Sequence, residues 1–253
     1  MTETRGNAGQ LYAELNAAWA IAKKDIAIYY LKPNIIVSGA LFPLFMFLAF
    51  AVGKPASPSV MIPGLIAITI LFSASSIEPV SIPIERRMKT FDRLVSAPVS
   101  LHAVVLGESL SGFLYSIGIA FVPFLAGLLI FGTPVLDVFP LILGIILTAF
   151  CFATMGTLFA AYPTESPGDI MSMLNLVRLP LIFISGVFIP LEEIPSVGQV
   201  LLYFSPLTYG NDLIQAAYRG STHFNPLTDI AMLCIFILLF QFIANRLYKK
   251  FNE

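Results

Sequence analysis

Residues 85–100 read ERRMKTFDRLVSAPVS and form a charged island between two apolar segments, each long enough to cross a bilayer. Six of the first nine residues of the island are ionisable, and acidic and basic side chains are interleaved. This pattern is typical of a short surface helix that meets a protein partner, rather than of a simple linker. The island therefore marks where one apolar span ends and the next begins.

The composition of the chain is that of a polytopic membrane protein. Of its 253 residues, 57% are hydrophobic and only 11% are charged, whereas a soluble domain has about 25% charged residues. Six apolar stretches are long enough to form transmembrane helices. We therefore predict an all-α membrane protein with six transmembrane helices, at residues 34–52, 60–82, 103–131, 138–162, 170–189 and 227–247.

The basic residues predict the orientation of these spans. All 14 lysines and arginines except Lys54, Arg178 and Arg219 lie before the first span, between the second and third, or at the C-terminal end of the sixth and beyond it. An even number of spans puts both termini on that face, and the positive-inside rule makes it cytoplasmic. We expect a multi-pass protein of the cell (plasma or inner) membrane with cytoplasmic termini. The net charge of -1 gives no reason to expect a nucleic-acid partner.

Residues 1–33 predict a cytoplasmic amphipathic helix ahead of the transmembrane domain, which we place at residues 34–253. On a helix, Leu11 and Trp19 fall on one apolar stripe, while Lys24 turns away from it. We expect this helix to lie flat on the membrane surface as an anchor. The alternative is a gate element that also contacts a partner.

The segment just before the last span, residues 187–209, is apolar but interrupted by prolines, and it is too short to cross. It predicts a re-entrant pair of short helices on the outer side of the membrane. Glu192 and Glu193 lie at its turn. We expect them to belong to a solvated turn, and the alternative is a role in opening the outer end of a pathway.

Three ionisable residues, Glu78, Glu108 and Arg178, lie in or near apolar spans, where charges usually mark function or pairing. Counting helical rise from the nearest loop places them at similar depths. We therefore expect Arg178 to form a structural ion pair with one of the two carboxylates. The alternative is a charge that contacts substrate or takes part in gating.

Both loop segments resemble the type 2 ABC transporter permease family. The island is similar to that family's motif Glu-Arg-Glu-x-Gly-Thr-Leu-Glu-Arg-Leu, followed by Pro-Val. The outer segment is similar to its second signature, with SGVFIPLE at residues 185–192, Pro195, and SPLTY at residues 205–209. The island departs from the family at Lys89, where glycine is usual, and at Arg87, where an acidic residue is common.

The resemblance implies that the island is a coupling helix between spans two and three, docked on a separate ATP-hydrolysing subunit. Phe91 and Leu94 would then be apolar anchors, while Glu85 has the alternative of capping the helix start. The coupling residues would be Glu85, Arg86, Thr90, Phe91, Asp92, Arg93 and Leu94. The outer gate or re-entrant signature would comprise Gly186, Pro190, Glu192, Pro206 and Tyr209.

The implied function is the permease subunit of an ATP-driven exporter, a transport subunit rather than an enzyme. No phosphate-binding loop occurs in the sequence, so ATP and Mg are expected on the partner ATPase, and no cofactor or metal is expected in this chain. The other implied partners are a second copy of the chain, forming a homodimer, and membrane lipid.

The expected substrate is a small amphipathic molecule, drug-like or lipid-like, moved outward as in the daunorubicin-resistance branch of the family. The alternative is a polysaccharide or a lipid-linked glycan. A passive channel and an intramembrane enzyme are the competing classes. Against an enzyme, the two histidines, His102 and His223, lie on opposite faces in the predicted topology and cannot share a metal or a proton relay.

Overall fold

The computed structural model describes residues 3–30, 41, 44, 45, 58–188, 191 and 196–252. Every regular element among these residues is a helix, which confirms the predicted all-α class. Five stretches of the described chain are long and apolar enough to cross a membrane: Pro58–Arg87, Leu101–Leu129, Val138–Ala160, Pro167–Ile184 and Pro226–Phe251. The predicted first span, residues 34–52, lies outside the described residues apart from 41, 44 and 45.

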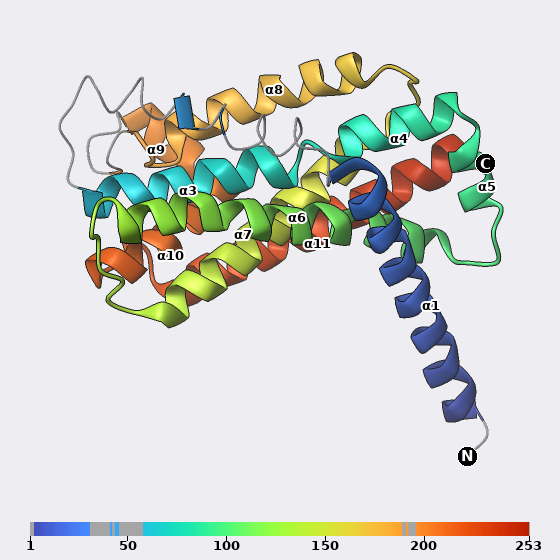
Figure 1. Cartoon of the computed structure of the whole chain (residues 1–253), viewed down its shortest axis with the longest axis horizontal. Coiled ribbons are helices and arrows are strands. Elements are labelled where there is room, and N and C mark those ends of the chain that lie inside the picture. Colours follow the sequence, from blue (N-terminus) through green and yellow to red (C-terminus); the bar gives the residue numbers. More distant parts are fainter. Residues whose placement is uncertain are drawn as a thin grey trace.

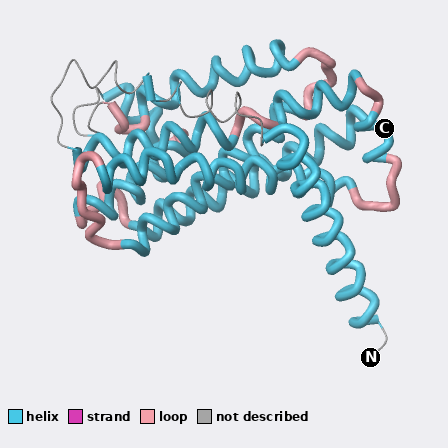
Figure 2. Tube along the Cα trace, viewed as in Figure 1, coloured by secondary structure: helices cyan, strands magenta, loops and turns pink. Residues whose placement is uncertain are grey.

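The long helices run roughly side by side, and α1 leaves them at a steep angle (Figure 1; the same trace is drawn as a tube in Figure 2). The short helix α5 and the C-terminus lie at one end of the bundle, and α9 and α10 lie at the other (Figure 1). The elements are α1 (Glu3–Asp25), η1 (Ile26–Tyr30), α3 (Pro58–Ala74), α4 (Glu78–Arg87), α5 (Thr90–Val95), α6 (Leu101–Leu129), α7 (Val138–Ala160), α8 (Pro167–Ile184), α9 (Ser196–Leu202), α10 (Pro206–Arg219) and α11 (Pro226–Asn252).

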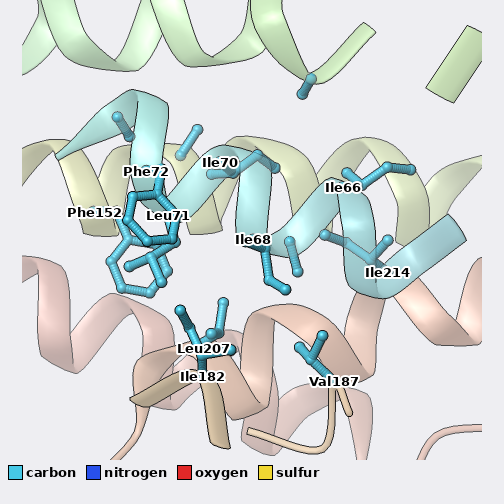
Figure 3. Packing of buried hydrophobic residues seen from close by; sticks show 14 of the residues in the cluster. Ile66, Ile68, Ile70, Leu71, Phe72, Phe152, Ile182, Val187, Leu207 and Ile214 are labelled. Carbon is cyan, nitrogen blue, oxygen red and sulfur yellow. The ribbon is translucent and has the colours of Figure 1, made fainter. Parts of the chain in front are cut away.

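Helix α3 is the centre of the main core because it is apolar on every side. It packs against α6, α7 and α10, and Ile66, Ile68 and Leu71 are completely buried. Figure 3 shows Leu71 beside Phe152 of α7 and Ile66 beside Ile214 of α10, with Ile68 on the side that faces Leu207 and Val187. The core thus holds together segments that lie far apart in the sequence.

The predicted second span, residues 60–82, is interrupted after Ala74, and the chain resumes as α4 at Glu78. Pro79 explains the interruption, because proline has no backbone N–H with which to continue the helical hydrogen-bond ladder. The hydroxyls of Ser75 and Ser76 donate to the carbonyls of Leu71 and Phe72, at the free end of α3.

Local capping determines where several other helices begin and end. The Ser100 hydroxyl accepts from the Ala103 N–H at 3.1 Å to start α6, and Asp137 accepts from the Phe139 N–H at 2.9 Å to start α7. Gly220, with φ 71°, ends α10 in the left-handed conformation that glycine adopts without strain. In the predicted outer segment 187–209, the structure places the short helix α9 and the beginning of α10.

The outer surface of the bundle is apolar over much of its length. Large side chains on four helices are exposed, as expected for surfaces that face lipid. They include Phe121, Leu125 and Leu129 on α6, Phe139 and Ile142 on α7, Leu176 and Phe183 on α8, and Leu238 and Phe242 on α11.

Candidate functional site

The candidate site is the end of the bundle that carries residues 85–100. Only six of these residues form a helix of their own, α5, so the single coupling helix expected over the whole segment is wrong. Residues 85–87 complete α4, and a tight turn through Lys89 follows. Lys89 has φ 59°, the only positive value at a non-glycine residue in the described chain. A left-handed residue is needed here, which is the physical reason why glycine suits this position.

Two of the predicted coupling residues point into the bundle instead of outward. Phe91 is fully buried, and its ring centroid lies 6.0 Å from that of Tyr248 on α11. Glu85 is buried at the last turn of α4, so it does not cap a helix start. Its carboxylate accepts a hydrogen bond from Lys24 Nζ at 2.7 Å. In this conformation neither side chain is available to a partner subunit, which corrects their predicted role as contacts.

Arg86 joins two helices within the chain. Its guanidinium donates to the carbonyl oxygens of Ala161, at 3.3 Å, and of Tyr162, just beyond the end of α7. It also lies over the Phe91 ring, 5.2 Å from the centroid. Arg86 therefore satisfies helix-end carbonyls of α7 and fastens α4 to α7.

The remaining residues of the segment form an exposed polar surface, which we call the α5 face. It contains an apolar side chain that the sequence interpretation did not single out, Met88, with 56% of its surface exposed. Leu94 is half-buried at its edge. The exposed members of the α5 face are Arg87, Met88, Lys89, Thr90, Asp92, Arg93, Ser96 and Pro98.

Helix α1 docks on α6, and Lys24 near its C-terminal end reaches Glu85 of α4. Ala18, Ile21 and Ala22 are buried, and a methyl group added at Gly107 of α6 would lie 2.8 Å from the Ala18 carbonyl oxygen. This close crossing of α1 and α6 needs small residues. The opposite stripe of α1 is exposed, including Leu11, Leu15 and Trp19, so only part of the predicted apolar stripe packs on the bundle.

A buried charged cluster forms where α1, α4 and α6 meet. Lys24 Nζ lies 2.7 Å from Glu85 Oε1 and 3.0 Å from Asp25 Oδ1, and Glu108 of α6 adds a third carboxylate to its surroundings. Burial by itself would lower the pKa of Lys24, but these carboxylates raise it above its ordinary value. Burial raises the pKa of Asp25 from 3.8 to about 6. No sequence signal placed Lys24 or Asp25 in a site.

The expected ion pair between Arg178 and a carboxylate is wrong. Among the described residues, Arg178 has no carboxylate within 4.0 Å; its guanidinium donates to the hydroxyls of Ser75 and Ser76 instead. Glu78 Oε1 accepts from the Gly112 N–H at 3.1 Å, and Glu108 faces Lys24 and Asp25. Similar depth along the helices did not bring Arg178 and a carboxylate into ion-pair contact.

The predicted outer signature lies at the opposite end of the bundle. Gly186 has φ 75°, Pro206 begins α10, and the buried Tyr209 hydroxyl donates to the Tyr203 carbonyl at 2.8 Å. Pro190 and Glu192 lie outside the described residues, as does Glu193.

The sequence interpretation missed the polar contact that closes this end, at Asp212 of α10. Its buried carboxylate accepts from the backbone N–H groups of His223, at 2.9 and 3.0 Å, and of Phe224, at 2.8 Å. Burial raises the pKa of Asp212 above its usual range, although these hydrogen bonds oppose the shift. Asp212 thereby holds the connection between α10 and α11 against α10.

Comparison with known proteins places the chain in a family. Residues 16–218 match the family described as ABC-2 type transporter. The inner membrane transport permease YadH of Escherichia coli (strain K12) is 24% identical over 199 residues, covering 75% of this chain and 74% of that protein. Nodulation protein J of Neorhizobium galegae is 26% identical over 213 residues, covering 79% and 76%. Nodulation protein J of Rhizobium leguminosarum bv. trifolii is 29% identical over 106 residues, which span only 42% of this chain and 40% of that relative.

Proposed function

Because the chain belongs to the ABC-2 type transporter family, which makes it a membrane transport permease subunit, we propose that it forms the pathway of an ATP-driven exporter whose energy comes from a separate ATPase. In this proposal the α5 face lies in the cytoplasm and receives the ATPase. ATP and Mg bind to that partner and not to this chain. The α10 end then faces outward, and both termini are cytoplasmic.

The observation that carries the proposal is that some side chains of residues 85–94 anchor the segment to the bundle while others are exposed. Glu85, Arg86 and Phe91 bind the segment to α1, α7 and α11, while Met88 and Arg93 remain exposed. A surface that is charged, carries an apolar anchor and is rigidly supported from behind suits a protein interface, in which a few anchors supply most of the binding energy. Movement of a bound ATPase would be passed directly to three helices.

We propose that two copies of the chain enclose the pathway and that the cargo is an amphipathic, drug-like or lipid-like molecule. The exposed apolar side chains of α8 and the almost uncharged described spans favour such cargo over a highly charged polymer. A polysaccharide or lipid-linked glycan is the second candidate.

The test is affinity purification of the tagged chain from its own membranes, with co-purifying ATPase subunits identified by mass spectrometry. We expect Arg93→Glu to abolish ATPase recovery and Met88→Ala to reduce it, while both variants remain folded. Arg219→Glu, at an exposed arginine on α10 at the other end of the bundle, is the matched control and should retain the ATPase. Recovery of equal ATPase with wild type and Arg93→Glu would refute the proposed docking surface.

A further inference from the structure

The interruption between α3 and α4 lies deep within the Pro58–Arg87 span. Helix α3 has 17 residues and α4 has 10, so the break lies about 25 Å from one end and about 15 Å from the other. The hydrocarbon core of a bilayer is about 30 Å thick. Non-helical backbone at this depth needs protein or a polar cavity around it, and broken spans are typical of binding sites in transporters.

Arg178 of α8 reaches this break. Its Nε donates to Ser75 Oγ and its Nη2 to Ser76 Oγ, both at 3.0 Å, and the guanidinium lies 5.3 Å from the centroid of the Phe72 ring. The side chain is completely buried. Its third nitrogen, Nη1, has no hydrogen-bond partner among the described residues.

The charge of Arg178 is not neutralised by an ion pair with any described residue. The Ser75 and Ser76 hydroxyls are neutral and already donate to backbone carbonyls of α3. Glu78 lies in the neighbourhood, but its Oε1 accepts from the Gly112 N–H, and its carboxylate is packed between Gly112 and Gly156. Glu78 therefore acts on Arg178 only from a distance, and a buried cation without a directly paired anion is costly, so the site favours an anion.

We propose that Arg178, positioned by the Ser75 and Ser76 hydroxyls, binds the anionic oxygen group of an amphiphile, a phosphate or a carboxylate, at the break between α3 and α4. A guanidinium presents parallel N–H donors that match such groups, and Nη1 is the donor left over. Among the described helices α8 packs chiefly on α4, and its outer side exposes Leu176 and Leu179. An acyl chain lying along the outer side of α8 would bring its headgroup to the level of Arg178.

This inference rests on the proposed function and narrows its substrate class to amphiphiles with an anionic group. The same chemistry is available from transported cargo or from a resident anionic lipid. The two sources differ in outcome, because cargo stimulates ATP hydrolysis and crosses the membrane, whereas a resident lipid only binds.

The experiment measures binding of dodecyl phosphate and of the uncharged dodecyl maltoside to the full chain in nanodiscs of neutral lipid. We expect wild type to prefer the phosphate by about tenfold, the equivalent of one charge-assisted hydrogen bond. Arg178→Gln should lose this preference, and Arg178→Lys should keep part of it. The control Arg219→Gln should behave like wild type.

Wild type alone provides a decisive result if Arg178→Gln does not fold: equal affinity for the two amphiphiles would overturn the proposal. Retention of the phosphate preference in folded Arg178→Gln would also overturn it. Adding the ATPase then separates the sources, since stimulation and transport of dodecyl phosphate identify cargo, and binding without either identifies a resident lipid. Binding is measured without the ATPase, so failure of the docking surface at Arg93 leaves this result unaffected.

Discussion

Replacing Lys24 with methionine should loosen α1 from the bundle. The change keeps much of the side-chain length but removes the cation that lies 2.7 Å from Glu85 and 3.0 Å from Asp25. Glu85 loses a hydrogen bond from a charged donor, which contributes about 1.5–3 kcal/mol. Asp25 limits the remaining cost, because its pKa of about 6 lets it take up a proton near neutral pH.

The expected loss is about 2 kcal/mol, between the cost of about 3–5 kcal/mol for breaking a buried pair and about 0–1 kcal/mol for an exposed one. This intermediate value follows from exposure, since the Lys24 side chain is 32% exposed and the two carboxylates are at most 5% exposed. It corresponds to about a 30-fold change in the equilibrium constant and to a fall of about 6 °C in the midpoint of thermal unfolding.

The assay is thermal unfolding of the purified chain in detergent, followed in parallel by tryptophan emission. The chain has one tryptophan, Trp19, and it lies on α1, so its emission reports on this helix directly. Lys23→Met is the matched control, because Lys23 is the neighbouring lysine and is exposed. The reasoning is refuted if Lys24→Met and Lys23→Met unfold within about 1 °C of each other and share the same Trp19 emission.

Three further predictions concern buried groups. Asp25→Asn should stabilise the chain by up to about 3 kcal/mol above pH 6. The pKa of Asp25 is about 6 in the folded chain and 3.8 when unfolded, so the wild type loses stability as the pH rises from 3.8 to 6. Parallel curves of stability against pH for wild type and Asp25→Asn between pH 4 and 7 would contradict this. Phe91→Ala should lower the free energy of unfolding by about 3–5 kcal/mol, because the ring is fully buried against Tyr248. Met88→Ala should change it by less than about 0.5 kcal/mol. Equal unfolding midpoints for these two variants would count against the assigned orientations of Phe91 and Met88. Asp212→Ala should cost about 3 kcal/mol by leaving two backbone N–H groups unpaired, and hydrogen exchange at His223 and Phe224 should accelerate; unchanged exchange at both amides would show that the carboxylate does not hold this connection.

The sequence predicted the features that depend on long apolar runs and on charge placement. Four predicted spans correspond to α6, α7, α8 and α11. A long apolar segment in lipid forms a helix because its backbone hydrogen bonds must be satisfied within the segment. The segment 85–100 was singled out correctly as a charged connection, and the family resemblance followed from its motif. The glycine position at Lys89 was noticed as a departure, and its positive φ now gives the physical reason.

The features that the sequence did not predict depend on which way a side chain turns. The hydrophobic pattern of six residues around Phe91 cannot show whether that ring meets a partner or Tyr248. Depth along a helix placed Arg178 level with two carboxylates, but depth says nothing of rotation about the helix axis. Pro79 was a readable signal for the break after Ala74, yet the length of the apolar run outweighed it. The docking of α1 depends on Gly107, whose role is visible only when two helices cross.

The break after Ala74 divides one long span into two separate helices, α3 and α4. Helix α3 is anchored on all sides by the core, whereas α4 carries Glu85 at one end and Glu78 at the other. Because Glu85 ties α4 to α1 and Arg86 ties it to α7, a displacement of the α5 face would be passed to these two helices together with α4. Arg178 donates to Ser75 and Ser76 just before the start of α4, so a displacement of α4 would also reach the guanidinium through residues 75–77.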